Sequence, residues 1–166
     1  MMRNKLVNEN FGFELLKVTL KEKGDDILQV LPRNKGLHKL VYTKNSLKYY
    51  YVFKDQPFHK ADFIFHTNYG EWESLNVECL EYALQYNYLL LFGYADGKIY
   101  IITARRFKEL AEKYNSFRNV EGKRYMVSTK SYLITNEMTA SVPLKDLMRF
   151  NLEWMKYSHT LKGRVS

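Results

Sequence analysis

The sequence predicts an α/β (α+β) fold, with a central mixed β-sheet flanked by helices. A helical pattern opens the chain, short β-prone runs fill its middle, and further helical patterns alternate with strands. The 166 residues suit one ordinary domain, and a hydrophobic fraction of 46% can build its core. We expect a single domain over 1–166, with a core of about 10–114, a β/helical appendage of about 120–158 and a basic tail over 159–166.

The first part of the core is expected to be one helix followed by strands. Residues 11–23 carry apolar side chains at helical spacing, and Gly24 stands where helices commonly end. β-Prone residues then recur in short runs separated by turn residues. The predicted strands are 27–31, 39–43, 48–53 and 61–66, with a hairpin turn over 44–46.

The second part of the core alternates helices and strands. After a loop over 68–73, Ser74 or Asn76 can cap a helix that runs to about Tyr86. An Asp-Gly turn joins two strands, and a helix follows them directly. These last three elements are predicted over 88–92, 98–103 and 104–114.

The last third of the chain is expected to hold two strands, over 124–128 and 132–135, and one helix over 143–157. Pro143 suits the first turn of this helix. Its apolar stripe runs between Leu144 and Met155. Two roles for the stripe stay open: packing onto the sheet of the same chain, or forming the interface of a homodimer.

Basic charge makes a nucleic acid, DNA in particular, the expected partner. The chain has 26 Lys and Arg against 18 Asp and Glu, a formal net charge of +8, which attracts polyanions. The densest basic region interleaves its cations with aromatic residues, a mixture that can grip phosphates and stack bases. The predicted contacts are Arg105, Arg106, Lys108, Arg118, Lys123 and Arg124, together with Lys44 from a second basic segment. If both segments lie on one side, they form a groove wide enough for a duplex.

Several other classes of protein are disfavoured. The single cysteine, Cys79, excludes an internal disulfide and a Cys-cluster zinc site, and we expect it to be buried in a helix. No stretch approaches the roughly 20 apolar residues of a membrane span. Met1 to Asn10 lacks the apolar core of a signal peptide. We therefore expect a cytoplasmic protein, or one in the host cytoplasm if it is viral, without a membrane partner.

A resemblance appears over residues 10–114. Glu14 lies in an opening helix, Phe-Glu-Leu-Leu-Lys-Val-Thr-Leu-Lys-Glu-Lys-Gly, and a hairpin over 37–54 ends in Tyr-Val-Phe-Lys. A helix with Gln85, a strand pair and another helix follow. This order resembles the core of the PD-(D/E)XK nuclease superfamily, particularly small archaeal Holliday-junction resolvases. The resemblance implies a restriction-endonuclease-like fold and Mg²⁺-dependent cleavage of phosphodiesters.

The catalytic motif of that superfamily is incomplete here. Lys54 matches the family lysine, but Val52 stands where its partner glutamate is expected and Lys39 falls near the hairpin aspartate. Magnesium needs oxygen ligands, which neither replacement supplies.

A shifted register of the resemblance supplies another candidate site. Asp62 would bind Mg²⁺ with Glu78 or Glu81, and Lys54 or Lys60 would be the basic partner. Glu14 keeps the place of the glutamate in the family's first helix.

Two classes of function follow from these patterns. The first is a DNA-binding or DNA-processing protein, a Mg²⁺-dependent endonuclease if it is catalytic. The alternative is a non-catalytic module, of viral, plasmid or defence origin, that binds nucleic acid or protein on a degenerate nuclease fold. The missing glutamate favours the module, whereas the carboxylates of Asp55, Asp62, Glu71 and Glu73 favour the enzyme.

Overall fold

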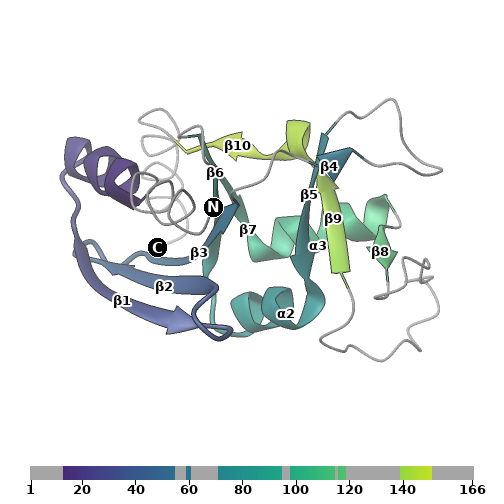
Figure 1. Ribbon diagram of the computed structural model, residues 1–166, viewed down its shortest axis with the longest axis horizontal. Helices are drawn as coiled ribbons and strands as arrows, with labels where there is room; N and C mark the ends of the chain where they lie inside the picture. Colours follow the sequence, from purple (N-terminus) through teal and green to yellow (C-terminus); the bar gives the residue numbers. More distant parts are fainter. Residues whose placement is uncertain are drawn as a thin grey trace, which may run out of the picture. The chain divides into compact units, whose positions relative to one another are not determined.

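The chain has a mixed α+β structure (Figure 1). The computed structural model describes residues 13–54, 59–60, 71–94, 98–114, 116–118 and 139–150, with only the backbone described for 59–60, 71–72 and 118. The chain divides into two compact units. Unit 1 comprises Met1–Pro57, Leu89–Ile101 and Met148–Ser166, and unit 2 comprises Phe58–Tyr88 and Ile102–Leu147.

Unit 1 is built on a six-stranded mixed sheet, to which unit 2 contributes only the last two residues of β7. In spatial order the strands are β1 (Ile27–Arg33), β2 (His38–Thr43), β3 (Lys48–Lys54), β6 (Leu89–Tyr94), β7 (Ile99–Thr103) and β10 (Met148–Arg149). β1, β2 and β3 form an antiparallel meander, and β10 pairs antiparallel with β7. β3 and β6 are parallel, so the chain between them makes a long crossover.

One face of this sheet packs against a helix over residues 13–22 (Figure 1). Tyr49 and Tyr51 of β3 are buried there with Leu16 and Leu20 of the helix. Four successive residues of β3 are buried, because a central strand is covered on both faces and alternation no longer exposes every second side chain. The helix and the strands of 27–54 match the prediction. Val18, one of the apolar residues at helical spacing in 11–23, is nevertheless exposed.

The turns of the meander use left-handed backbone conformations. Asn34, Lys35 and Gly36 between β1 and β2 all have positive φ, of 53°, 57° and 84°. At the other end, the buried carboxylate of Asp25 accepts hydrogen bonds from the backbone N–H groups of Asp26 and Asn45, at 2.8 and 2.9 Å. Asp25 thereby ties the start of β1 to the turn before β3.

Unit 2 contains a separate antiparallel sheet with two α-helices. Its strands, in spatial order, are β4 (His59–Lys60), β5 (Glu71–Asn76), β9 (Thr139–Pro143) and β8 (Phe117–Arg118). The helices α2 (Val77–Gln85) and α3 (Ala104–Lys113) pack against each other, and α3 also contacts β9. A short 3-10 helix, η3 (Leu144–Asp146), follows β9. The sequence did not predict this second sheet.

Both α-helices of unit 2 begin at a side-chain cap. Asn76 Oδ1 accepts from the N–H of Glu78 at 2.8 Å, so Asn76 rather than Ser74 caps α2. Thr103 Oγ1 caps α3 by accepting from the N–H of Arg106 at 3.0 Å. Such caps satisfy N–H groups that have no partner within the helix. Cys79 is buried in α2, as expected.

Two predicted elements are wrong. The helix predicted over 143–157 is absent from its described part: Pro143 ends β9, η3 is one turn long, and β10 follows. The predicted loop over 68–73 is also wrong at its end, because β5 already begins at Glu71. The predicted strands over 61–66, 124–128 and 132–135, and the basic tail, lie outside the described residues. No helix in the described part of the chain is long and apolar enough to cross a membrane.

Candidate nucleic-acid interface

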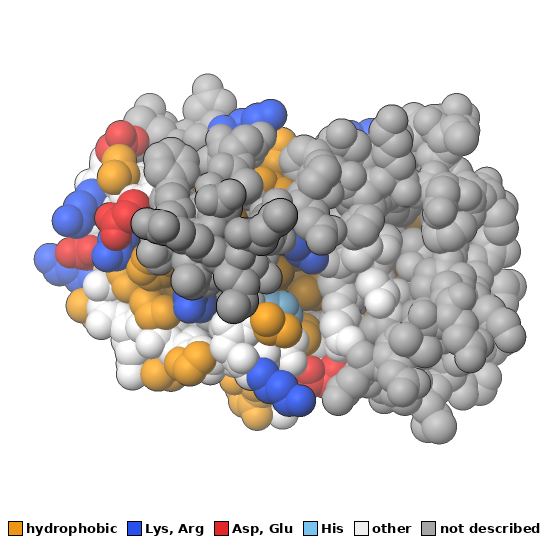
Figure 2. All heavy atoms as spheres, viewed as in Figure 1, with side chains coloured by type: hydrophobic (Ala, Val, Ile, Leu, Met, Phe, Trp, Pro, Cys, Tyr) orange, Lys and Arg blue, Asp and Glu red, His pale blue; other side chains and the backbone are white. Residues whose placement is uncertain are grey.

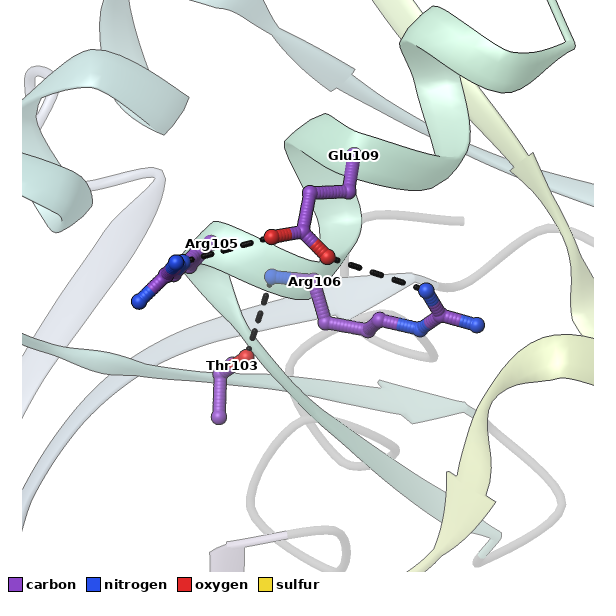
Figure 3. A network of polar contacts seen from close by, with 4 residues as sticks. All are labelled: Thr103, Arg105, Arg106 and Glu109. Carbon is purple, nitrogen blue, oxygen red and sulfur yellow. Dashed lines mark hydrogen bonds and ion pairs between the residues drawn. The ribbon is translucent and has the colours of Figure 1, made fainter.

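The first turn of α3 presents two arginines to solvent (Figure 3). The side chain of Arg105 is 87% exposed and that of Arg106 is 58% exposed. Glu109, one turn later, lies between them: its Oε1 is 3.2 Å from Arg105 Nε and its Oε2 is 3.7 Å from Arg106 Nη1. The Thr103 cap fixes the backbone from which both arginines project.

The charges in this turn are opposite to those that stabilise a helix N-terminus. A helix N-terminus carries partial positive charge and favours acidic residues, but the first turn of α3 has none. Glu109 offsets part of the repulsion through exposed ion pairs worth roughly 0.3–0.5 kcal/mol each. Two guanidinium groups against one carboxylate leave a net positive site.

The guanidinium of Arg105 keeps most of its donors for a ligand. Within the described part of the chain its ion pair with Glu109 uses Nε, and the group is almost fully exposed. A guanidinium has five N–H donors in a fork that matches the oxygens of a phosphate. The turn can therefore bind a phosphate without first breaking the pairs that position it.

Lys108, on the same helix, is differently placed. Its Nζ is 3.0 Å from Glu81 Oε1 on α2, and both side chains are only one-third exposed. This ion pair joins the two helices of unit 2. Lys108 thus has a structural partner on another helix, whereas the ion pairs of Arg105 and Arg106 within the described residues are both with Glu109 of their own helix.

The other predicted contacts belong to different units or lie outside the described residues. Arg118 ends β8, while Lys123 and Arg124 lie outside the described residues. Lys44 is exposed in the β2–β3 turn and belongs to unit 1, whereas Arg105 belongs to unit 2. On the face drawn in Figure 2, the Lys and Arg side chains of the described residues are scattered among hydrophobic and acidic ones. The shared groove stays a prediction.

Three of the four predicted catalytic carboxylates lie in the described part of the chain, and each contacts a neighbouring side chain. Glu14 pairs with Lys17 at 3.3 Å on the exposed side of its helix. Glu81 is held by Lys108, and Glu78 lies in the first turn of α2, where its Oε2 is 3.7 Å from Cys79 Sγ.

The other members of the predicted site are less fully placed. Lys54 is the half-buried last residue of β3. Asp62 lies outside the described residues, and Lys60 is described only by its backbone in β4.

A magnesium ion needs several converging oxygen ligands. Among the described residues, no three His, Cys, Asp or Glu side chains gather into a group that could hold a metal ion. These residues by themselves therefore do not fit a Mg²⁺ site, and the predicted site depends on Asp62.

Among the described residues, two carboxylates are buried in a way that the sequence did not predict. Asp25 and Glu73 are each 3% exposed. Glu73 lies on the inner side of β5, where Leu75 is also buried, and its Oε1 accepts from the N–H of Ser74. Glu73 was named only as one of the carboxylates that favour the enzyme, and the one signal for its burial was its two-residue spacing from Leu75, which marks one face of a strand. Asp25 directly follows Gly24, which indicated a turn but gave no sign that the Asp25 carboxylate is buried.

The chain matches no protein-family model, no curated protein and no solved structure. Its function must therefore be inferred from its own charges and geometry, because a shared fold class does not determine activity.

Proposed function

We propose that the chain is a DNA-binding protein that contacts phosphates with the first turn of α3. The observation that carries this proposal is the exposed pair Arg105 and Arg106 at a capped helix N-terminus, whose charge the carboxylate of Glu109 offsets only in part. Backbone N–H groups, the helix dipole and two guanidinium forks all favour an anion at this position.

The charge pattern of unit 1 supports the same partner. No Asp or Glu occurs in any strand of the six-stranded sheet, which does carry basic residues. They are Arg33, Lys39, Lys48, Lys54 and Arg149. With a net charge of +8, this distribution favours association with a polyanion.

The test is a salt titration of binding to a labelled DNA duplex. Each phosphate contact contributes about −0.9 to the slope of log K against log salt. The double variant Arg105→Ala/Arg106→Ala is expected to bind more weakly and to lose about 1.8 from the slope. Lys113→Ala is the matched control, because Lys113 is a cation in the last turn of the same helix. An unchanged slope in the double variant would reject this interface.

A second proposal is that the chain is a Mg²⁺-dependent endonuclease that requires Asp62. Two observations support it. The order of the elements resembles that of the PD-(D/E)XK core: a helix, β1–β3, α2, β6–β7 and α3. Lys54 also lies at the end of β3. β4 and β5 intervene before α2, which departs from that order.

Cleavage of linear, branched and single-stranded DNA with Mg²⁺ or Mn²⁺, measured beside Asp62→Ala, tests this second proposal. Cleavage by the parent alone supports it. Salt-sensitive binding without cleavage leaves the non-catalytic module. If the chain neither binds nor cleaves DNA, both proposals fail and a protein partner becomes the better hypothesis.

A further inference from the structure

Among the described strands, β1 is an outer strand of the six-stranded sheet, with β2 on its inner side (Figure 1). Two large apolar residues of the strand face solvent, Leu28 at 70% and Leu31 at 38% exposure, and Leu37 in the following turn is 65% exposed. A strand of seven residues is long for an edge. No charged side chain occurs in it before Arg33. Long apolar edges of this kind are templates for pairing with another strand.

Two features interrupt the edge. The register with β2 shifts between Ile27 and Gln29, which leaves Leu28 as a bulge, and Pro32 has no N–H to donate. An antiparallel self-pairing centred on Val30 sets Leu28 of one copy opposite Pro32 of the other. The two interruptions then coincide, and the stretch from Gln29 to Leu31 remains free to pair.

We propose that β1 is a self-association edge, along which two copies of this chain pair antiparallel about Val30. Leu28 of each copy then covers Pro32 of the second copy. The exposed Leu28 and Leu31 then lie along the interface. Such a contact is isologous, so it closes as a dimer instead of growing into a filament.

The charges at the two ends of β1 favour this direction of pairing. Asp26 precedes the strand and Lys35 follows it, and both are exposed. In the antiparallel register Asp26 of one copy lies beside Asn34 and Lys35 of the other, at both ends of the pair. A parallel pairing would place like charges together. The net charge of +8 opposes association at long range, so the dimer should strengthen with added salt while DNA binding weakens.

Sedimentation velocity over a range of protein concentrations, without DNA, tests the proposal. The parent chain is expected to form a dimer. Leu31→Lys should weaken it at least about tenfold, because it puts a charge in the centre of the pairing. Val18→Lys is the matched control: Val18 is an exposed valine on the helix of unit 1, so its replacement should leave the dimer unchanged.

A charge swap tests the register itself. Asp26→Lys and Lys35→Glu should each weaken self-association, and an equimolar mixture of the two variants should form a heterodimer, since opposite charges then face each other at both ends. Circular dichroism verifies that each variant is folded. A monomeric parent at all concentrations overturns the proposal. So does a dimer that is insensitive to Leu31→Lys, or a mixture that does not associate.

Discussion

Gly93 shows how tightly single residues of β6 are constrained by β3. A Cβ placed on Gly93 would lie 2.5 Å from the hydroxyl oxygen of Tyr51 and 3.0 Å from two of its ring carbons. Tyr51 is buried, so its ring has little room to move. Gly93→Ala should therefore cost about 1–3 kcal/mol of unfolding free energy, measured by urea denaturation.

The matched variant for this prediction is Tyr51→Phe/Gly93→Ala. Removal of the hydroxyl takes away the closest contact and leaves the ring carbons in place, so it should recover part of the loss. If the double variant is no more stable than additive single effects predict, the clash with Tyr51 is not the cause.

Tyr49 gives unit 1 a sensitivity to alkaline pH. Its hydroxyl is buried and has no hydrogen-bond partner within the described residues. Desolvation by burial, and secondly the charge of Asp25, raise the pKa of Tyr49 above its ordinary value of 10.0. Because the unfolded chain ionises this tyrosine first, stability is fully present below about pH 10 and is lost as the pH rises beyond it.

The variant Tyr49→Phe should lack this alkaline loss. Urea midpoints of parent and variant at about pH 8 and about pH 11 measure the difference, and comparison of the two chains cancels the other tyrosines. Near neutral pH the variant should be as stable as the parent or slightly more so, since it removes a buried polar atom without a partner. Parallel pH profiles would contradict this role of Tyr49.

At the scale of elements, the cap of α2 is a junction between a strand and a helix. β5 ends at Asn76 and α2 starts at Val77, so no loop separates them. Asn76→Ala removes the acceptor for the N–H of Glu78 and should cost about 1 kcal/mol of unfolding free energy. Asn76→Asp keeps an acceptor and should retain most of the stability in the same denaturation experiment. Equal losses in both variants would show that the cap is not what matters there.

The sequence predicted elements well where local chemistry and burial agree. The helix that became α3 combines a Thr cap with inward Phe107 and Leu110, and both side chains are buried. The helix predicted over 143–157 failed because its stripe also fits another structure. Leu147 and Phe150 are buried three residues apart, whereas Met148, which the helical stripe requires inward, is exposed in β10. Pairing with β7 decides this segment, and such distant pairing leaves no local signal.

The residues of the candidate site also divide into those that local patterns predict and those whose contacts depend on the fold. Arg105 and Arg106 could be predicted, since a strand followed by a helix is readable from local patterns and places them in a first turn. The ion pair between Lys108 and Glu81 could not be predicted from the sequence, because the two residues are on separate helices. The burial of Glu73 could not be predicted for a related reason: a buried carboxylate contradicts the usual preference of a strand interior, and only its neighbours in the fold make it tolerable.

At the scale of the whole molecule, unit 1 is assembled from three separate stretches of the chain. The last stretch supplies Phe150, which is buried against Tyr49 with ring centroids 5.7 Å apart and donates its N–H to Ile99. A chain ending at residue 147 should lose at least about 3 kcal/mol relative to one ending at residue 150. Urea unfolding of the two truncated chains isolates the effect of β10 and Phe150. Equal stabilities would show that unit 1 does not need them.

The parallel register of β3 and β6 has a consequence for how the protein is made. Tyr49 pairs with Leu89, so the partners are 40 residues apart in the chain. At about 5–20 residues per second, a ribosome delivers the second partner roughly two to eight seconds after the first. During that interval the apolar strand Lys48–Lys54 has its final neighbour on one side only. The nascent chain is then most open to chaperones and to unwanted pairing, and the arrival of β6 ends that exposure.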